Sequence, residues 1–386
     1  VVELGQLLAG PFCGQLLGDM GAEVIKVEPP GAGDPMRVWG QGAEKVQWEV
    51  IARNKKSVSA NLRIPEGQAL VRKLIGKADI LVENFKPGTM EKWGFAPDVL
   101  LAENPGLIIA RMSGYGQTGP YSGRPGFGRI GNAFGGLSYL AGYPDRPPVT
   151  PGSATIPDYL SGIYGAMGAV LAMEARRKTG RGQVVDIGLY EPVFRILDEL
   201  APAFQHKGYV RERMGPGTVN VVPHSHYPTK DGRWIAIACT SDKIFARLAE
   251  AMGAPELAND GKWGTIRQRE AARAEVDAYV GAWTSSLTRD ELLQTCEEAQ
   301  VPCGPVYAID EIFEDPQYKA RGNILTMQDP RIGELAIPNL VPRLSETPGE
   351  VKWLGPAMGE HNGEIYRDWL KLSEAEMEAL AAARVI

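Results

Sequence analysis

Apolar residues recur along the first part of this chain with the two periods that distinguish strands from helices. Val1–Leu4 is a short apolar run, Phe12–Met20 has helical spacing after a loop, and Glu23–Val27 is apolar again. We place Pro11 at the first position of the helix and end the helix at Gly21. A strand, a helix and a second strand in this order predict a βαβ unit and therefore a parallel sheet.

The same alternation continues to about residue 190. It predicts further strands at Ser57–Asn61, Ala78–Glu83, Leu107–Met112 and Gln183–Leu189, and helices at Pro65–Gly76, Pro97–Glu103 and, as the longest, Pro157–Thr179. Loops rich in Gly, Asn and Pro follow the strands that end near residues 83 and 112. Ligands of open α/β sheets bind at the carboxyl ends of the strands, so we expect the site in these loops.

The pattern changes near residue 200. Residues 208–228 are loop-like, and after them we expect a strand at Trp234–Cys239 and amphipathic helices at Lys243–Met252, Arg269–Ser285 and Arg289–Ala299. We predict domains at 1–200 and 201–300, the second smaller and of α+β type, with Pro302–Val306 crossing back to the first. The segment 301–386 then contributes a strand at Glu334–Ile337 and a final helix from about Glu364. The predicted fold class is α/β with a parallel sheet.

Composition narrows the choice of function. The 386 residues are 44% hydrophobic and 23% charged, as in ordinary globular proteins. A net charge of −6 argues against general nucleic-acid binding. The four cysteines are scattered without metal-ligand spacing, which is typical of free thiols in a reducing compartment, so we expect a cytoplasmic protein. We see no signal peptide and no apolar run long enough to span a membrane, and the opening on a strand leaves room for missing native residues before Val1.

Asp158 is the leading candidate for chemistry. It follows Pro157 where a loop turns into the longest predicted helix. A carboxylate in the first turn is stabilised by free backbone N–H groups and by the positive end of the helix dipole. Such a group should stay ionised near neutral pH, which suits a nucleophile. Aspartate is also common in first turns merely because it stabilises the helix, so this segment alone leaves both interpretations open.

Other motifs point to an anionic ligand rather than to familiar cofactors. The glycines of the first βα loop do not form GxGxxG, which disfavours a nicotinamide or flavin role. His224 and His226 share a strand face but lack a third ligand, so we expect no metal. Basic residues gather in the βα half and suggest a ligand with several phosphates: Arg37, Arg53, Lys55, Lys56, Arg63, Lys86 and Lys92.

Short segments along nearly the whole chain carry a family resemblance. They are Leu8–Phe12, Gly21–Glu28, Gly33–Arg37, Asn54–Ser57, Val82–Phe85, Gly114–Gly116, Pro157–Asp158, Lys178–Gln183, Pro302–Val306 and Leu354–Gly355. In this order they resemble the family III CoA-transferases, the group that contains formyl-CoA transferase and carnitine CoA-transferase.

The resemblance implies a Rossmann-like large domain, completed by the C-terminal segment, and a small domain, in a homodimer of two interlocked rings. It implies coenzyme A and acyl-CoA as substrates, with no metal, NAD or flavin. The catalytic aspartate of the family matches Asp158. The family's CoA-binding positions match Leu7, Leu8, Ala9, Arg37, Arg63, Asn84, Phe85 and Lys92.

By the same resemblance, CoA passes from an acyl-CoA donor, with succinyl-CoA as a candidate, to a carboxylic acid. The route is an aspartyl anhydride and then an aspartyl-CoA thioester on Asp158. Backbone N–H groups of glycine-rich loops can stabilise the oxyanions, and the substrate or oxyanion candidates are Gly126, Phe127, Gly128, Gly135 and Gly136. Candidates to pair a second carboxylate, which would favour a dicarboxylic acceptor, are Arg124, Arg129, Arg146 and His224.

Differences between this sequence and the family pattern define the alternative functions. The same superfamily contains 2-methylacyl-CoA racemases, whose histidine lies in a Gly-His-Asp segment that matches Gly126–Gly128. Phe127 cannot exchange a proton, so a racemase or epimerase is the second hypothesis rather than the first. Some transferases carry an acidic residue where Gly128 stands, and the glycine-rich lid of formyl-CoA transferase has only Met214–Gly217 as a substitute here. A nucleotide-binding module without catalysis is the third hypothesis.

Overall fold

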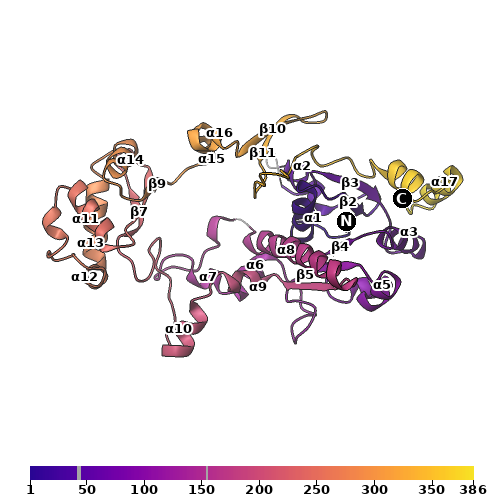
Figure 1. Ribbon diagram of the computed structural model, residues 1–386, viewed down its shortest axis with the longest axis horizontal. Coiled ribbons are helices and arrows are strands. Elements are labelled where there is room, and N and C mark those ends of the chain that lie inside the picture. Colours follow the sequence, from indigo (N-terminus) through magenta and orange to yellow (C-terminus); the bar gives the residue numbers. More distant parts are fainter. Residues whose placement is uncertain (41–44, 154) are drawn as a thin grey trace. The chain divides into compact units, whose positions relative to one another are not determined.

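The computed structural model describes residues 1–40, 45–153 and 155–386, and the chain divides into two compact units (Figure 1). The large unit contains Val1–Tyr139, Thr150–Val210 and Gly322–Ile386. The small unit contains Leu140–Val149 and Arg211–Arg321. The chain thus leaves the large unit and returns to it. The domain boundaries expected at residues 200 and 300 stay predictions.

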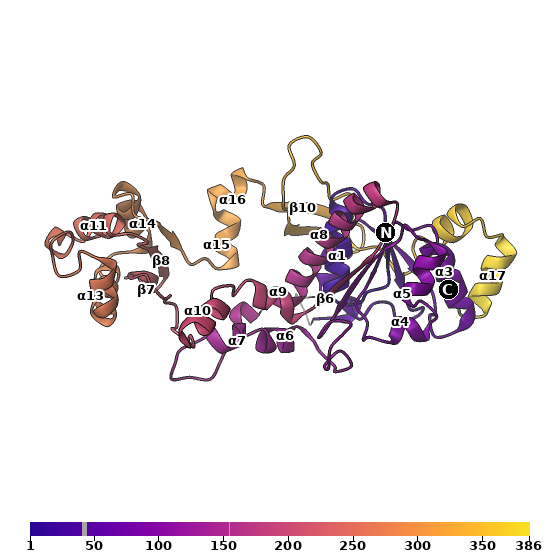
Figure 2. The ribbon, with the colours of Figure 1, turned by 60° about the horizontal axis from the view of Figure 1, so that its bottom comes forward.

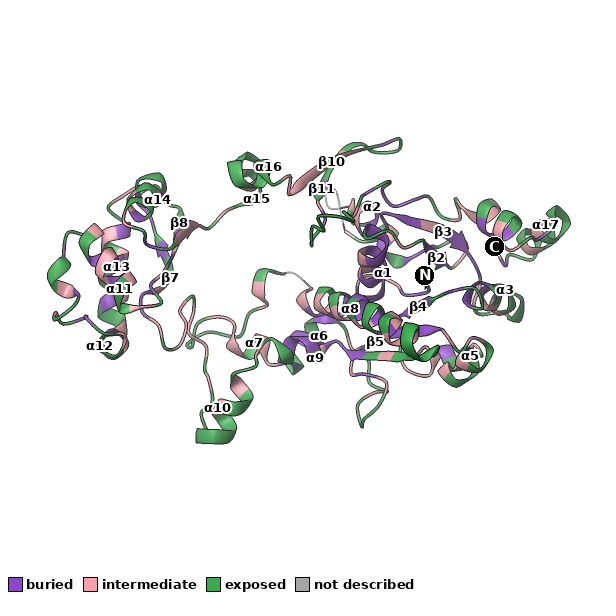
Figure 3. Cartoon of the chain, in the orientation of Figure 1, coloured by how far each residue is buried: buried purple, intermediate pink, exposed green. Residues whose placement is uncertain are grey.

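A six-stranded parallel sheet forms the centre of the large unit. Its strands are β1 (Val2–Glu3), β2 (Val24–Glu28), β3 (Lys55–Ser59), β4 (Ile80–Glu83), β5 (Ile108–Ser113) and β6 (Val184–Gly188), in the spatial order β3-β2-β1-β4-β5-β6. Strands β1 to β5 are almost entirely buried (Figure 3). The order reverses between β1 and β4, and ligands of such sheets bind in the crevice beyond that point.

Helices cover both faces of this sheet (Figure 2). On one face, α1 (Ala9–Asp19) and α8 (Ile156–Thr179) pack against apolar residues of β4, β5 and β6. On the other, α3 (Pro65–Ile75), α5 (Pro97–Glu103) and C-terminal residues that include Tyr366 join one apolar cluster. Burial on both faces explains why the strands are continuous apolar runs rather than alternating ones.

C-terminal residues close the edge of the sheet at β3. The Ser57 N–H donates to His361 Nδ1 at 3.2 Å, and the His361 N–H donates to the Ser57 carbonyl at 2.9 Å. The Ser59 N–H donates to Asn362 Oδ1, and the Tyr366 hydroxyl donates to the Ser59 carbonyl, both at 2.9 Å. Backbone groups that an edge strand would otherwise leave unpaired are therefore satisfied by residues about 300 positions away.

The small unit is built on a three-stranded antiparallel sheet. Its strands are β7 (His224–Pro228), β8 (Trp234–Ala238) and β9 (Cys303–Pro305), with β8 in the middle. Helices α11 (Asp242–Ala251), α12 (Ile266–Ala271), α13 (Arg273–Thr284) and α14 (Arg289–Glu298) accompany it. A separate apolar cluster with Ile235, Phe245 and Val276 forms its core.

Short elements make up the rest of the described chain. They are the 3₁₀ turns Pro35–Val38, Pro151–Ser153 and Pro255–Leu257, helices α2 (Gln47–Ile51), α4 (Thr89–Lys92), α6 (Gly128–Phe134), α7 (Leu137–Leu140), α9 (Tyr190–Arg195), α10 (Leu200–Lys207), α15 (Ile309–Glu314), α16 (Pro316–Ala320) and α17 (Glu374–Ala382), a π-helical segment at Gly363–Trp369, and strands β10 (Ile324–Asp329) and β11 (Gly333–Pro338). Within the described ranges, every helix is too short or too polar to cross a bilayer.

The structure corrects four local expectations. Helix α1 begins at Ala9, ahead of Pro11, because proline is tolerated throughout a first turn whose N–H groups lack partners. The single helix expected at Arg269–Ser285 is two, separated at Ala272. The region 208–228 contains β7, which its pairing with β8 stabilises. The segment Pro302–Val306 contains β9 of the small sheet, and the chain returns only at Gly322.

Candidate active site

The loops that follow β1 and β4 are bound to each other at the point where the strand order reverses. The Gln6 N–H donates to Asn84 Oδ1 at 2.7 Å, and Asn84 Nδ2 donates to the Gln6 carbonyl at 2.8 Å. One carboxamide thus pairs with both backbone groups of one residue. These bonds hold together the two loops that carry the predicted CoA contacts Leu7, Leu8, Ala9, Asn84 and Phe85.

Arg37 has a more structural environment than its predicted role suggests. Its Nε and Nη2 donate to the two carboxylate oxygens of Glu28, each at 2.7 Å. Nη2 also donates to the Pro356 carbonyl, and the guanidinium stacks 3.7 Å from the centre of the Trp48 ring. Only 17% of the side chain is exposed. Arg37 therefore braces the first loop region against the C-terminal segment and offers little free surface to a phosphate.

Arg63 and Lys92 are exposed cations that remain accessible. Lys92 lies on α4 and lines a shallow pocket of about 700 Å³ together with Lys73 and Trp93. The Trp93 ring meets the ring of Phe85 edge to face, with 5.0 Å between centres. A cationic rim beside aromatic rings fits a phosphorylated nucleotide.

Two other members of the predicted basic cluster are not available to a ligand. Arg53 is buried and binds Asp19 at 2.6 Å, and Lys55 is fully buried and binds Glu3 at 2.8 Å. The expectation that they bind phosphate is wrong, because each already neutralises a buried carboxylate.

Asp158 lies in the first turn of α8, where the sequence predicts it, and its side chain is partly buried. Burial raises the pKa of this carboxyl to about 6, and a hydrogen bond with its own backbone opposes the rise. The sequence predicts that the helix terminus keeps the pKa of Asp158 low, but burial has the larger effect and raises it. At pH 7 the carboxylate still exceeds the acid by about ten to one. No described side chain forms an ion pair with it.

Gly128, at the start of α6, is the residue that meets Asp158. A Cβ built on Gly128 would lie 2.1 Å from Asp158 Oδ2. Phe127 beside it is 67% exposed. The other glycine candidates have different neighbours in the direction of a side chain: a Cβ on Gly126 would meet Gly114, and one on Gly135 would meet Val193.

A Cβ on Gly136 would face Leu197. Among the four glycine candidates, Gly128 is therefore the one whose side-chain direction points at the Asp158 carboxylate.

The four candidates for pairing a second carboxylate of the substrate are divided between the two units. Arg124 and Arg129 belong to the large unit with Asp158, whereas Arg146 and His224 belong to the small unit. The Arg124 guanidinium stacks 3.7 Å from the Tyr121 ring centre. Arg129 follows Gly128 directly, is exposed, and donates to Thr150 Oγ1 at 3.4 Å.

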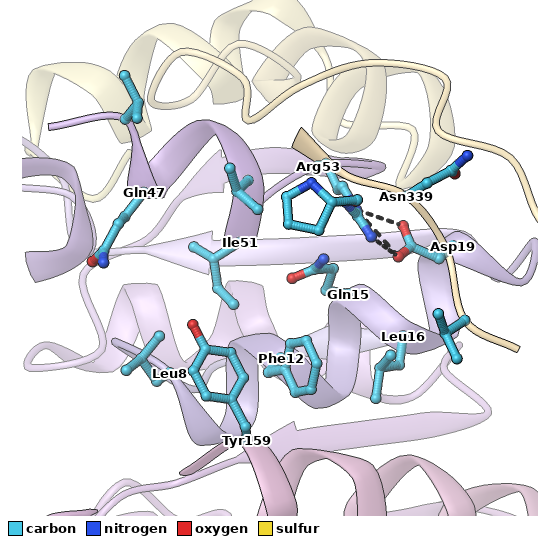
Figure 4. Close-up of a pocket in the computed structure, with 14 residues that line it drawn as sticks. Leu8, Phe12, Gln15, Leu16, Asp19, Gln47, Ile51, Arg53, Tyr159 and Asn339 are labelled. Carbon is cyan, nitrogen blue, oxygen red and sulfur yellow. Dashed lines mark hydrogen bonds and ion pairs between the residues drawn. The ribbon is translucent and has the colours of Figure 1, made fainter. Parts of the chain in front are cut away.

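Tyr159 is a residue that the sequence reasoning missed. It lies beside Leu8 and Phe12 in the wall of an apolar pocket of about 490 Å³ in the large unit (Figure 4). Its ring meets the Phe12 ring edge to face at 4.8 Å. Asp158 is not among the residues that line this pocket. The buried Arg53–Asp19 pair closes one side of it.

The described residues contain no cluster of three or more His, Cys, Asp and Glu side chains that could hold a metal ion. All four cysteines lie in the described part of the chain and are free thiols.

The strand order and the loops at its reversal point define a Rossmann-type α/β protein with a partly buried aspartate at a helix start. Residues 1–362 match the model of CoA-transferase family III. The chain belongs to this family, and the protein is a CoA-transferase.

Named relatives and a solved structure agree with this assignment. The chain is 50% identical to the succinyl-CoA–L-malate CoA-transferase alpha subunit of Chloroflexus aurantiacus, over all of this chain and 91% of the relative. It is 31% identical to the human succinyl-CoA:glutarate CoA-transferase, over all of this chain and 88% of that one. A CAIB/BAIF family protein from Brucella suis has a similar fold, with a TM-score of 0.84, 35% identity and coverage of 95% of this chain and 97% of its own.

Proposed function

We propose that this CoA-transferase works through covalent intermediates on Asp158. The observation that carries the proposal is the environment of that carboxylate. Burial raises its pKa to about 6, no described cation neutralises it, and its Oδ2 faces a glycine. By the family resemblance, Asp158 matches the catalytic aspartate. A partly desolvated carboxylate without a counter-ion is a better nucleophile than a hydrated or ion-paired one.

The steps balance without an external acid or base. A carboxylate oxygen of Asp158 attacks the thioester carbonyl of the donor, and the CoA thiolate leaves, which gives a mixed anhydride. The thiolate then attacks the aspartyl carbonyl, the donor acid leaves as a carboxylate, and aspartyl-CoA remains. The acceptor carboxylate attacks the aspartyl-CoA carbonyl and expels the thiolate. Finally the thiolate attacks the acyl carbonyl of this second anhydride, which releases the new acyl-CoA and restores Asp158.

We propose that CoA binds along the loops after β1 and β4. Leu7, Leu8, Ala9, Asn84 and Phe85 would contact it there. The exposed cations Arg63 and Lys92 would bind its phosphates. Arg37 would support this site as a brace for the loop rather than as a direct phosphate ligand, because its guanidinium is already bound to Glu28.

For the acids, we propose succinyl-CoA as donor and a dicarboxylic acid as acceptor. Succinyl-CoA occurs in the names of several relatives, with L-malate, D-citramalate or glutarate as the other acid. The cation that we assign to the second carboxylate is Arg129, since it follows Gly128 and has an exposed guanidinium. Replacing Arg129 by glutamine should raise the KM for dicarboxylic acids about tenfold and leave that for monocarboxylic acids unchanged. The same selective loss in Arg124→Gln instead would contradict this assignment.

We also propose that the chain forms the interlocked homodimer of its family. Helix α8 supports this with an apolar stripe, since Ile163, Met167, Val170 and Leu171 are between 46% and 62% exposed and share helical spacing. Light scattering after gel filtration tests this proposal. A mass of one chain at micromolar concentration would refute it.

Mass spectrometry tests the covalent mechanism. We expect incubation with succinyl-CoA to add the mass of a CoA thioester to a peptide that contains Asp158. Asp158→Asn should lose the adduct and roughly 10³-fold or more of the activity. Asp290→Asn is the matched control, because Asp290 is also a first-turn aspartate and is exposed. Full activity of Asp158→Asn, or an adduct that persists in it, would refute the mechanism.

The racemase alternative is not favoured by the family assignment. By the family resemblance, Phe127 matches the position of the racemase histidine, and a phenyl ring cannot carry a proton. Deuterium from solvent should therefore not enter the α-carbon of a 2-methylacyl-CoA incubated with the protein.

A further inference from the structure

Leu7 has a backbone conformation that leucine rarely adopts. Its φ is 62°, in the left-handed region, where a Cβ crowds the following carbonyl. A bulky residue keeps such a conformation only where its surroundings hold it there. Leu7 lies in the loop after β1, on which the proposed function places CoA.

The Leu7 backbone is held by a buried carboxylate. The Leu7 N–H donates to Asp34 Oδ1 at 3.1 Å, and the same oxygen accepts from the Met36 N–H at 2.8 Å. The other oxygen, Oδ2, lies 2.6 Å from Lys26 Nζ. Both Asp34 and Lys26 have side chains that are only 1% exposed.

Lys26 binds the same loop at Gly5, two residues before Leu7. Its ammonium donates to the Gly5 carbonyl and lies 3.2 Å from Glu3. Burial alone would lower the pKa of Lys26, but Asp34 and Glu3 raise it, so the lysine stays charged. Lys55 Nζ lies 2.8 Å from the other carboxylate oxygen of Glu3, Oε2. The cluster therefore contains two lysines and two carboxylates, all buried.

We propose that the buried Lys26–Asp34 pair is a positioning device that holds the Gly5–Leu8 loop, with Leu7 in its left-handed conformation, in the shape that CoA binds. Neither side chain needs to touch the substrate. Asn84 fixes Gln6 from the side of β4, and the pair fixes Gly5 and Leu7 from the side of β2. The loop is thus held residue by residue. This inference rests on the proposed function.

The test removes both charges at once, so that neither is left buried alone. In Lys26→Met/Asp34→Ala, Leu7 loses its acceptor and should relax to negative φ. We expect the KM for succinyl-CoA to rise about tenfold, and the KM for the acceptor acid and kcat to change less than about threefold. Adding Leu7→Gly should lower the KM again by about threefold, because glycine adopts positive φ without strain. The recovery is partial, since the contact of the leucine side chain with CoA stays lost. A general loss of stability would not be repaired by that glycine.

The control is Arg269→Met/Asp242→Ala, which removes another pair with a fully buried cation, in the small unit. It should lower the melting temperature comparably and leave the KM for succinyl-CoA unchanged. If the first double variant does not fold, Asp34→Asn should give a smaller rise in KM that Leu7→Gly again reverses in part.

Two results separate this inference from the proposed function. If the wild-type protein neither binds CoA in a calorimetric titration nor transfers it, the proposed function is wrong. If a crystal structure of the double variant keeps Leu7 at positive φ, or if Leu7→Gly restores nothing, the positioning role is wrong even when transfer is intact.

Discussion

The Asp158 carboxylate fills the space into which any side chain on Gly128 would project. A Cβ at Gly128 would lie 2.1 Å from Asp158 Oδ2, well inside van der Waals contact. The helix that begins at Gly128 can therefore approach the aspartate only because its first residue has no side chain. The closeness of the two residues desolvates the carboxylate and limits the directions in which it can turn.

Gly128→Ala should displace the carboxylate and little else. The clash involves the end of a side chain rather than backbone, so we expect Asp158 to rotate and the fold to persist. A displacement of about 1 Å can cost a reaction about 100-fold, and we expect kcat to fall by 10- to 100-fold. Gly123→Ala is the control in the same loop, because a Cβ there meets no atom within 4 Å. Wild-type kcat in Gly128→Ala would show that the position of the carboxylate is not critical.

The rate should depend on pH through Asp158. Only the carboxylate is a nucleophile, and burial raises its pKa to about 6. We expect kcat/KM to be constant above pH 7 and to fall about tenfold per unit well below pH 6. Profiles with two donors of different acid strength distinguish the enzyme from the substrate, since a limb set by Asp158 does not move between them. An acid limb that follows the donor would contradict this assignment.

The stability of the fold should depend on pH in the opposite direction from the rate. The raised folded-state pKa means that the stabilising contribution of Asp158 is complete below the unfolded value of 3.8 and is lost as the pH rises through about 6. Asp158→Asn never carries the charge. Its melting temperature should exceed that of the wild type by roughly 2–4 °C at pH 8, and the difference should disappear at pH 4. An equal difference at both pH values would assign the gain to something other than the buried charge.

Substitutions of Arg37 and Arg63 should have different effects, the first on the stability of the fold and the second on the affinity for CoA. Arg37→Met leaves Glu28, which is 1% exposed, without its guanidinium, and should lower the free energy of unfolding by about 3 kcal/mol in urea titrations. Arg63→Met removes an exposed cation and should leave unfolding unchanged.

CoA affinity, measured by calorimetry, should fall severalfold in Arg63→Met, with a smaller dependence on salt than in the wild type. If Arg63→Met destabilises the fold, or binds CoA as the wild type does, the division of roles is wrong.

Sequence patterns predicted the elements whose information is local. The period of the apolar residues located Pro97–Glu103 to the residue and α8 within one. A proline stands in the first turn of both helices, and Gly180 marks the end of α8. Strand β7 was missed, since its residues pair with β8 rather than forming an apolar run of their own.

The sequence predicted residues of the site only where a local motif identified them. Asp158 is visible as a first-turn carboxylate, but its contact with Gly128 joins two elements whose packing no local pattern encodes. Arg53 and Lys55 look like phosphate ligands because their partners, Asp19 and Glu3, lie more than 30 positions earlier. A basic residue beside a loop has the same local sequence whether it faces solvent or a buried acid.

The edge of the sheet has a consequence for how the chain is made. Strand β3 is synthesised early, but the groups that cover it belong to His361, Asn362 and Tyr366, and the Asn61 N–H bonds to the Val385 carbonyl at 2.8 Å. During synthesis the exposed edge must wait while about 300 further residues leave the ribosome, at a typical 5–20 residues per second. The small unit, whose segments lie between, can complete its core in that interval. The large unit therefore begins to fold first and finishes last, and a chaperone that shields a free strand edge would act on it in that window.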